Sequence, residues 1–366
     1  MSDIRGKYFP VGKGLTYGFK IDDFHILFDI ARFSKNCSLL YDLEYFYENR
    51  NLDILSISHF DDDHMGGIKD LIDYGFKFKK VIIPYFESDE LSIVNLSYIF
   101  SKINSMKKKN RHLNIDEYIL ELLERYMFNE FSEVSFFEKD LKDLLANEDI
   151  DAEIVRAKDS LTETYSIEKG NEKIEFWKLH YMNSKCSNSH KINKFKKEME
   201  QIGICNQWDL IVSLKSRYMD IKAIYQKVFV NMNHTSIFLI HGPVNNSFIQ
   251  STEYDGTVFL RNSKFKFDKM NKFYSLITGD FDMSKNLVKL NKYIDSFKYV
   301  LVPHHSDDKS WNNSLCKRNH DIVWIVTIEA IKKRPYGLVV KNIYDNDQEL
   351  YICDKINPFE YKFILP

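Results

Sequence analysis

The sequence lacks the features that mark secreted and membrane-spanning proteins. The N-terminus has no apolar signal region, and no later segment has the uninterrupted run of about 18 apolar residues that a membrane-spanning helix needs. There is no Cys-x-x-Cys pair, and the cysteines are the five scattered residues Cys37, Cys186, Cys205, Cys316 and Cys353. This usage is typical of a reduced, cytosolic protein and argues against a disulfide framework. We therefore expect a soluble, cytoplasmic protein with no membrane partner.

The chain also lacks an excess of positive charge. Its 51 Lys and Arg residues and 53 Asp and Glu residues give a formal net charge of -2. This balance excludes an overall basic coat for nucleic acid but leaves room for a local basic groove. The 366 residues, of which 44% are hydrophobic and 28% charged, are enough to bury a large core in an ordinary globular protein.

Apolar periodicity predicts strands and helices that alternate along the chain. A hairpin over residues 15–30 and a helix over residues 38–48 precede a strand over residues 52–57 and a helix over residues 68–74. Further strands are predicted over residues 81–85, 174–179, 210–214, 237–240, 273–277, 299–302 and 322–328. Strands interleaved with helices in both halves of the chain indicate two sheets that are covered by helices.

Two stretches interrupt this alternation. Residues 88–147 show helical spacing of apolar residues, with Lys and Glu between them, and are predicted to form a helical insertion. Residues 183–201 are polar and contain five Lys, and are predicted to form a Lys-rich loop or insertion. With these two additions, residues 1–366 are expected to form a single domain.

The most informative motif follows the strand over residues 52–57. Four potential metal ligands, His59, Asp61, Asp63 and His64, lie within six residues and precede a Gly-Gly pair. The pattern His-x-Asp-x-Asp-His supplies two ligand pairs, one for each of two metal ions. The alternative is an acidic, solvated loop, since carboxylates normally stay in water. Because the cluster lies between a buried strand and a helix, we favour a metal site.

Two further predicted strands end in residues of the same kind. Asp280 follows the apolar strand over residues 273–277, and its carboxylate could bridge two cations about 3.5–4 Å apart. On its own, Thr-Gly-Asp is often a plain turn. The paired histidines His304 and His305 follow the strand over residues 299–302 and a Pro. We expect the three ligand loops to gather at one edge of the sheets.

Together these motifs resemble the metallo-β-lactamase superfamily, and most closely the soluble C-terminal domain of bacterial competence DNA-uptake channel proteins. The loop from Ser58 to Gly67 is similar to that group's His-x-Asp-x-Asp-His-x-Gly-Gly, and Thr-Gly-Asp280 and Pro-His-His305 follow in the same order. Weaker similarities to its opening strands and its Asn-x-x-Ser strand lie at residues 11–29 and 233–239. Ser306 departs from the pattern, which has Gly there. The resemblance implies an α+β fold, a four-layer αβ/βα sandwich, with a dinuclear metal site at one edge.

By this resemblance the protein is expected to be a metal-dependent hydrolase. The expected reaction is that of a nuclease, which cleaves phosphodiester bonds of DNA or RNA with a hydroxide shared by two divalent ions, Zn²⁺ or Mn²⁺. The expected metal ligands are His59, Asp61, Asp63, His64, Asp280, His304 and His305. His59 and Asp61, together with His304 or His305, would hold the first ion. Asp63 and His64 would hold the second ion, and Asp280 would bridge the two. Asp63 would also orient the attacking water, and the histidine that is not a ligand, with His305 as the candidate, would protonate the leaving group.

Other interpretations of the same motifs stay open. The enzyme could act instead on a lactone, a cyclic nucleotide or another small ester, or the chain could be a partner-activated effector with a structural metal site. In that last case the helical insertion would bind the protein partner. His180, at the end of a predicted strand, is a further candidate ligand, although such a histidine is more often an ordinary hydrogen-bonded side chain.

Candidate phosphate contacts come from three basic segments. They are residues 107–111, residues 191–197, and the pair Lys264 and Lys266. For the first of these, the alternative is a solvated helix end. Aromatic residues make up 15% of the chain, and some of them could stack on bases.

Overall fold

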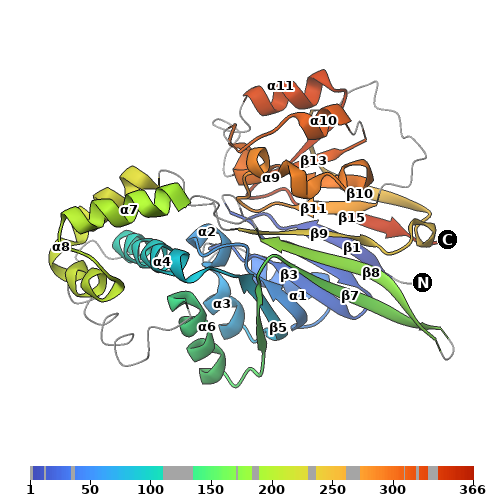
Figure 1. The fold of residues 1–366 in the computed structure, drawn as a ribbon. Coiled ribbons are helices and arrows are strands. Elements are labelled where there is room, and N and C mark those ends of the chain that lie inside the picture. The colour runs from blue at the N-terminus through green and yellow to red at the C-terminus, as the bar shows by residue number, and fades with distance from the viewer. Residues whose placement is uncertain are drawn as a thin grey trace.

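The chain forms strands and helices whose arrangement is shown in Figure 1. The computed structural model describes residues 3–11, 14–33, 38–109, 135–169, 172–183, 189–229, 236–260, 273–308, 310–318, 321–328 and 337–366. The strands are β1 (Ile4–Tyr8), β2 (Tyr17–Ile21), β3 (Phe24–Phe28), β4 (Asn51–Ser56), β5 (Lys77–Pro84), β6 (Glu153–Ala157), β7 (Ser160–Lys169), β8 (Glu172–Asn183), β9 (Ile237–Pro243), β10 (Ser251–Leu260), β11 (Tyr274–Ile277), β12 (Phe297–Leu301), β13 (Val323–Thr327), β14 (Glu349–Cys353) and β15 (Phe359–Ile364). The helices are α1 (Leu39–Tyr47), α2 (Asp62–Met65), α3 (Ile68–Asp73), α4 (Ser88–Lys109), α6 (Phe136–Asn147), α7 (Ser189–Gln201), α8 (Gln207–Val228), α9 (Met283–Leu290), α10 (Ser314–Arg318) and α11 (Gly337–Asp345), with short 3₁₀ turns η1 (Asn246–Phe248), η2 (Ile294–Ser296) and η3 (Pro303–Ser306).

The fifteen strands of the described residues belong to one continuous mixed sheet. Their order is β6-β5-β4-β3-β2-β1-β15-β10-β14-β13-β12-β11-β9-β8-β7. Neighbours from β3 to β6 and from β11 to β14 run parallel, and the other pairs run antiparallel. Only two residues join the outer strands β6 and β7, and the N–H of Asn183 on β8 donates to the Asp159 carbonyl between them (3.2 Å). The sheet is therefore nearly closed, like a barrel.

The expected four-layer αβ/βα sandwich is wrong, because the strands do not form two separate sheets. Strands β1, β15 and β10 pair with one another in the middle of the order and join the β2–β6 half to the β14–β7 half. The register is continuous across the junction, with Ile4 opposite Phe363 and Thr252 opposite the same residue. None of these three linking strands was predicted from the sequence, which is why two separate sheets were expected.

Three apolar clusters hold the helices and the sheet together. One lies inside the curved sheet and contains large side chains such as Trp177 and Tyr299. A second contains residues of α1, α3, α4, α6, α7 and α8 together with β4 and β5, and a third contains residues of α9, α10 and α11 together with β11–β14. Figure 1 shows the two groups of helices on opposite sides of the strands. Apolar clusters cover both faces of the central parallel strands, so that β12 and β13 are buried along their whole length.

The parallel strands bring the important loops to one edge. β3 ends just before Asp29, β4 before His59, β11 before Asp280, and β12 before the paired histidines. Because parallel neighbours end at the same edge of a sheet, their following loops lie beside one another. The N–H of Ile237, at the start of β9, donates to the carbonyl of Ser58 (2.9 Å) and adds that strand to the same edge.

The predicted strand over residues 210–214 is also wrong, because these residues lie within helix α8. Buried residues recur in α8 at helical spacing, and they are Leu210, Leu214, Tyr218, Ile221 and Tyr225. The Asn206 side chain caps this helix by accepting a hydrogen bond from the Asp209 N–H (2.9 Å). The short apolar run over residues 210–214 has the composition of a strand, but over the whole segment the apolar residues recur every three or four positions, as in a helix.

Apart from Asn183, the last residue of β8, the two predicted insertions are mainly helical where they are described. Within residues 88–147, α4 and α6 pack against each other, and Tyr98 donates a hydrogen bond to Asp140 (2.6 Å). Within residues 183–201, α7 begins at Ser189 and pairs with α8. No helix in the described part of the chain is both long and apolar enough to cross a membrane.

Candidate metal centre

The carboxylate of Asp280 lies at the centre of the ligand loops, and each of its oxygens faces two histidines. Oδ1 lies 3.2 Å from Nε2 of His64 and 3.8 Å from Nε2 of His305. Oδ2 lies 3.7 Å from Nε2 of His59 and 3.7 Å from Nε2 of His304. All four imidazole rings therefore point the same nitrogen at one buried carboxylate.

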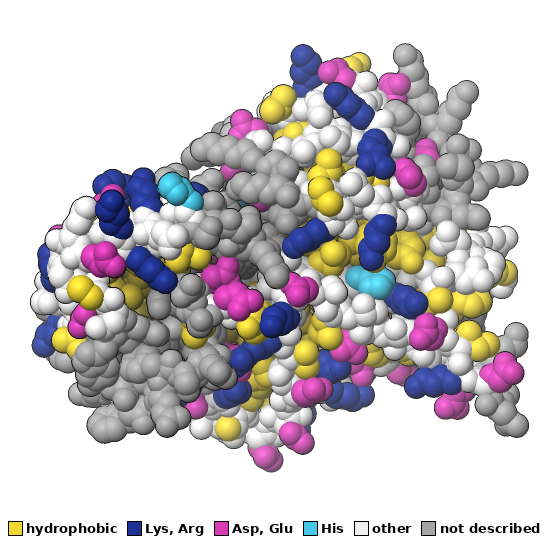
Figure 2. Space-filling model, viewed as in Figure 1, with side chains coloured by type: hydrophobic (Ala, Val, Ile, Leu, Met, Phe, Trp, Pro, Cys, Tyr) yellow, Lys and Arg dark blue, Asp and Glu magenta, His cyan; other side chains and the backbone are white. Residues whose placement is uncertain are grey.

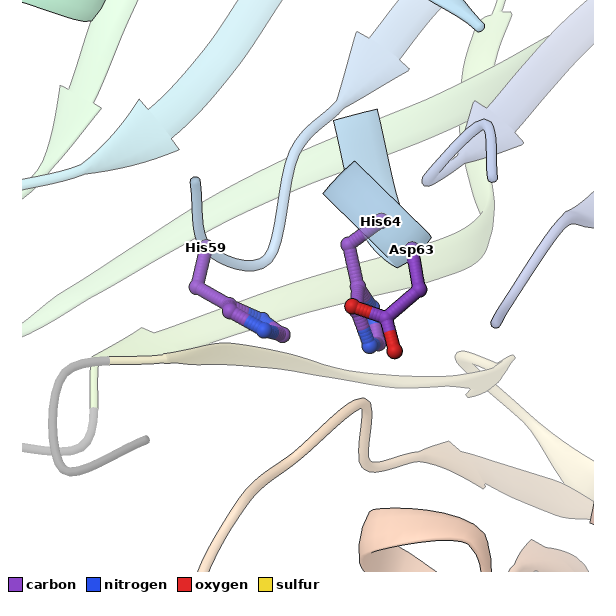
Figure 3. Close-up of side chains that lie close together, drawn as sticks. All are labelled: His59, Asp63 and His64. Carbon is purple, nitrogen blue, oxygen red and sulfur yellow. The ribbon is translucent and has the colours of Figure 1, made fainter. Parts of the chain in front are cut away.

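Asp61 and Asp63, the two expected carboxylate ligands in the loop after β4, lie on different sides of Asp280. Asp61 Oδ2 is 3.7 Å from Nε2 of His59, and Asp63 Oδ2 is 3.9 Å from Nε2 of His305. The short helix α2 carries Asp63 and His64, and Figure 3 shows both converging with His59 on a common space. The structure thus brings together all seven residues that the sequence analysis expected to be metal ligands.

These side chains form two overlapping groups that have the spacing of metal ligands. One group is His59, Asp63 and His64, and the other is His64, Asp280 and His305, with one ligand atom of each residue within 4.8 Å of the others in its group. Two ligand atoms that are each about 2.1 Å from a tetrahedral ion lie about 3.4 Å apart. The 3.2–3.8 Å separations from Asp280 are close to that value.

Asp29, which the sequence analysis did not include among the site residues, holds His64 in place. Its Oδ2 lies 2.7 Å from Nδ1 of His64, and its carboxylate accepts hydrogen bonds from the Ser58 N–H and hydroxyl, both at 2.6 Å. A carboxylate can only accept, so Nδ1 of His64 carries a proton and Nε2 is the nitrogen directed at Asp280. The available sequence signal was the position of Asp29, directly after a strand beside the ligand-loop strand.

His305 is oriented in a similar way from another strand. Its Nδ1 lies 3.0 Å from the carbonyl oxygen and 3.0 Å from the hydroxyl of Thr327, at the end of β13. The carbonyl can only accept, so Nδ1 donates and the lone pair of a neutral His305 is on Nε2. His304 is less enclosed, and its Nδ1 lies 3.5 Å from the Ser310 hydroxyl.

The backbone that carries the paired histidines has an uncommon conformation. His304, His305 and Ser306 have φ angles of 49°, 50° and 67°, in the left-handed region that costs a residue with a side chain about 1–2 kcal/mol. The N–H of His304 donates to the carbonyl of Gly279 (3.1 Å) and ties this turn to the loop of Asp280. Strained backbone of this kind concentrates at functional sites. Here it directs two consecutive side chains to the same carboxylate.

Burial and charge set the protonation of the cluster. Burial lowers the pKa of both His59 and His305 to about 4, so both rings are neutral at pH 7. Burial also lowers the pKa of His64, but the charges of Asp280 and Asp29 and their hydrogen bonds outweigh it and raise the pKa well above its usual value. For Asp280, burial raises the pKa, whereas His64 and its neighbours bring it well below the usual value.

The donor set fits divalent metal ions. Nε2 of His59 is buried and has no hydrogen-bond partner, although an unsatisfied buried polar atom costs about 1–3 kcal/mol. Imidazole nitrogens combined with carboxylate oxygens suit Zn²⁺ and Mn²⁺. A cation between these groups would satisfy the ring nitrogens and the central carboxylate at once.

Two other buried or strand-end histidines have structural partners. His180, on β8, has its Nδ1 3.0 Å from the hydroxyl of Thr162 and its ring beside Tyr293, and it belongs to neither metal-binding group. His241 accepts a hydrogen bond from the Trp177 indole N–H (3.2 Å), and burial lowers its pKa to about 3.

Several expected substrate contacts lie outside the described residues. They are the side chains of Lys107–Lys109, residues 110–111, Lys264 and Lys266; residues 233–235 of the motif similar to Asn-x-x-Ser also lie outside them.

The chain matches no protein-family model and no curated protein. The site is therefore interpreted from its own geometry.

Proposed function

We propose that the protein is a metal-dependent hydrolase that cleaves phosphodiester bonds of DNA or RNA with two divalent ions. The observation that carries the proposal is the central Asp280, whose two oxygens each face a separate pair of histidine Nε2 atoms. A carboxylate with its two oxygens directed at different ligand sets is suited to bridging two ions. Such a pair of ions, Zn²⁺ or Mn²⁺, lowers the pKa of water and neutralises negative charge that develops in the reaction.

We assign ligands to each oxygen of Asp280 from the distances between these side chains. On the Oδ2 side, His59, Asp61 and His304 would hold one ion, since Asp61 lies beside His59. On the Oδ1 side, Asp63, His64 and His305 would hold the other, since Asp63 lies beside His305. Both paired histidines present Nε2 to Asp280, so we assign both as ligands.

Three further roles would be to orient His64, His305 and the attacking water. Asp29 and Thr327 fix the rings of His64 and His305, so that little reorganisation is needed when the site is filled. Asp63 is only partly buried, unlike its neighbour His64. Asp61 is also partly buried, but only Asp63 belongs to a group of close ligand atoms, so Asp63 is the carboxylate that we expect to accept a hydrogen bond from an incoming water.

The ions of a filled site would favour an anionic substrate through direct contact. The four carboxylates around the cluster, Asp29, Asp61, Asp63 and Asp280, balance the four positive charges of two divalent ions. A phosphoryl oxygen that binds an ion directly would still have its negative charge neutralised by that ion. A neutral ester or lactone would gain less from this contact, which is the reason to prefer phosphodiester hydrolysis over the small-ester alternative.

The test is hydrolysis of bis(p-nitrophenyl) phosphate and of single- and double-stranded DNA and RNA, with Mn²⁺, Zn²⁺, Mg²⁺ or EDTA. We expect activity that requires metal and that falls by more than about a hundredfold in Asp280→Asn, because loss of a direct ligand exceeds the effect of losing an outer hydrogen bond.

The matched control is Asp62→Asn in the same loop. Asp62 pairs with Arg32 (2.8 Å) at the surface and does not face the cluster, so its loss should leave the activity unchanged. Equal activity of Asp280→Asn and Asp62→Asn would refute the proposal. Hydrolysis of neutral esters alone would replace it with the small-ester function.

A further inference from the structure

Helices α7 and α8 carry a positive charge that the rest of the chain does not have. Residues 189–228 contain eight Lys and Arg but only four Asp and Glu. Because the whole chain has a formal net charge of -2, this helical pair is at +4 and the remainder at -6. Figure 2 shows dark blue side chains gathered at the end of the molecule where Figure 1 places these helices. The charge separation marks one local surface for a polyanion.

The two faces of α7 differ sharply. Ile192, Phe195 and Met199 are buried in the apolar cluster that α7 shares with α8. Lys194 and Lys197, three residues apart and hence on one side of the helix, are exposed. Neither of them pairs with a carboxylate among the residues that the structure describes. The basic side of the helix thus faces solvent.

Helix α7 is connected to the metal centre through both the chain and the packing. β8 ends at Asn183, which lies opposite Ile237, and the N–H of Ile237 donates to the carbonyl of Ser58, the residue before His59. From Asn183 to the start of α7 the chain can span at most roughly 20 Å. The apolar face of α7 also belongs to the same cluster as Phe60, the residue after His59.

We propose that the exposed face of α7, with Lys194 and Lys197 at its centre, binds the phosphate backbone of a polynucleotide beside the metal centre. Lysines that contact phosphates release counterions and provide affinity without reading the sequence. The face would hold the strand while one of its phosphodiesters reaches the cluster around Asp280. The guiding of a strand into the site rests on the proposed function, whereas binding to α7 does not.

The experiment is fluorescence anisotropy with labelled single-stranded and duplex DNA and RNA, using the full chain in EDTA over a series of salt concentrations. The variant is Lys194→Glu/Lys197→Glu. The matched control is Lys317→Glu/Lys341→Glu, which makes the same charge change at exposed positions of α10 and α11, in the other group of helices. Circular dichroism would establish that both variants are folded.

We expect the α7 variant to weaken binding by roughly tenfold or more at low salt and to reduce the salt slope by about 2 for duplex DNA, one for each lost phosphate contact. The control should bind like the unmodified protein. Equal binding by all three proteins, or no binding to any nucleic acid, would overturn the proposal.

Because EDTA removes the metals, this measurement is separate from the hydrolysis test. Metal-dependent cleavage of bis(p-nitrophenyl) phosphate without nucleic-acid binding would leave the hydrolase standing and refute the role of α7. Nucleic-acid binding through α7 without any hydrolysis would support the role of α7 and refute the proposed hydrolase.

Discussion

Asp29 lies behind His64, on the side of the imidazole ring that faces away from Asp280. It has a φ angle of 58° and is completely buried, and its carboxylate bonds to Ser58 and His64. In the proposed site its role would be to position the ligand His64 without touching the reacting groups. Asn is among the residues that tolerate this backbone region, so the carboxylate can be removed without adding strain.

Asp29→Asn is expected to weaken metal binding by about 10–100-fold, because the amide carries no charge and has one acceptor oxygen where Asp29 has two, so its NH₂ group must face either Ser58 N–H or His64 Nδ1. Isothermal titration calorimetry with Mn²⁺ or Zn²⁺ would measure the change. Asp53→Asn is the control, since Asp53 also accepts a backbone N–H, that of His25 (2.8 Å), in the same half of the sheet. If both variants bind metal equally well, Asp29 has no positioning role.

The protonation of His64 predicts that metal binding releases a proton. Its pKa is raised well above the usual value of about 6.5, so both ring nitrogens carry a proton at pH 7. His64 must lose the Nε2 proton before that nitrogen can act as a ligand, and metal affinity should therefore rise by up to about tenfold per pH unit below the raised pKa. His59 and His305, with pKa values of about 4, should contribute no protons at pH 7.

Calorimetric titrations in buffers with different ionisation enthalpies would count the released protons. An apparent binding enthalpy that is independent of the buffer would contradict the prediction.

At the scale of elements, the segment that leads into β2 supports the ligand loop from behind. The N–H of Leu15 donates to the carbonyl of Asp63 (3.0 Å). Gly14, just before it, has a φ angle of 116°, and a Cβ at this position would lie 2.4 Å from the same carbonyl oxygen. The segment of Gly14 and Leu15 therefore packs against α2 and supports the backbone of Asp63.

Gly14→Ala is expected to lower the free energy of unfolding by about 2–4 kcal/mol, because it combines backbone strain with a collision against the ligand loop. It should also weaken metal binding. Gly203→Ala is the control, since Gly203 has a positive φ of 76° but no atom within 4 Å of the added Cβ. It should cost only about 1 kcal/mol and leave metal binding unchanged, as denaturant unfolding and calorimetry would show.

The elements that carry the site were predictable because their signals are local. The apolar run that ends at Ser56 and the runs that end before Asp280 and His304 are short strands, and in the structure they are strands. Helix α8 was not predicted, because the short run over residues 210–214 near its start also fits a strand. Asp29 was missed because nothing in its own sequence neighbourhood shows that it contacts His64, 35 residues away.

At the scale of the whole molecule, the pairing of the strands could not be predicted from the sequence. Strands β1, β10 and β15 are half exposed along parts of their length, so they lack the continuous apolar pattern of a buried strand. Their partners lie far away in the chain, as with Ile4 and Phe363. The local patterns therefore gave separate strands, whereas the continuous sheet arises from long-range pairing.

This architecture places the candidate metal centre between the two halves of one sheet. His59, Asp63 and His64 follow strands of the β2–β6 half, and Asp280, His304 and His305 follow strands of the other half. Ions held by both sets would tie the halves together at an edge where β3 and β4 on one side and β11 and β12 on the other are not hydrogen-bonded to each other. Metal binding should therefore stabilise the whole fold and not one loop.

We expect Zn²⁺ or Mn²⁺ at about 100 times its dissociation constant to raise the free energy of unfolding by about 2.7 kcal/mol for each ion bound, because ions that bind only the folded chain shift the equilibrium by mass action. Differential scanning calorimetry should show a single transition that moves to higher temperature with metal and returns with EDTA. Asp280→Asn should lose this response, while Asp62→Asn should keep it. A transition temperature that does not change with metal in the unmodified chain would mean that the cluster around Asp280 does not bind these ions.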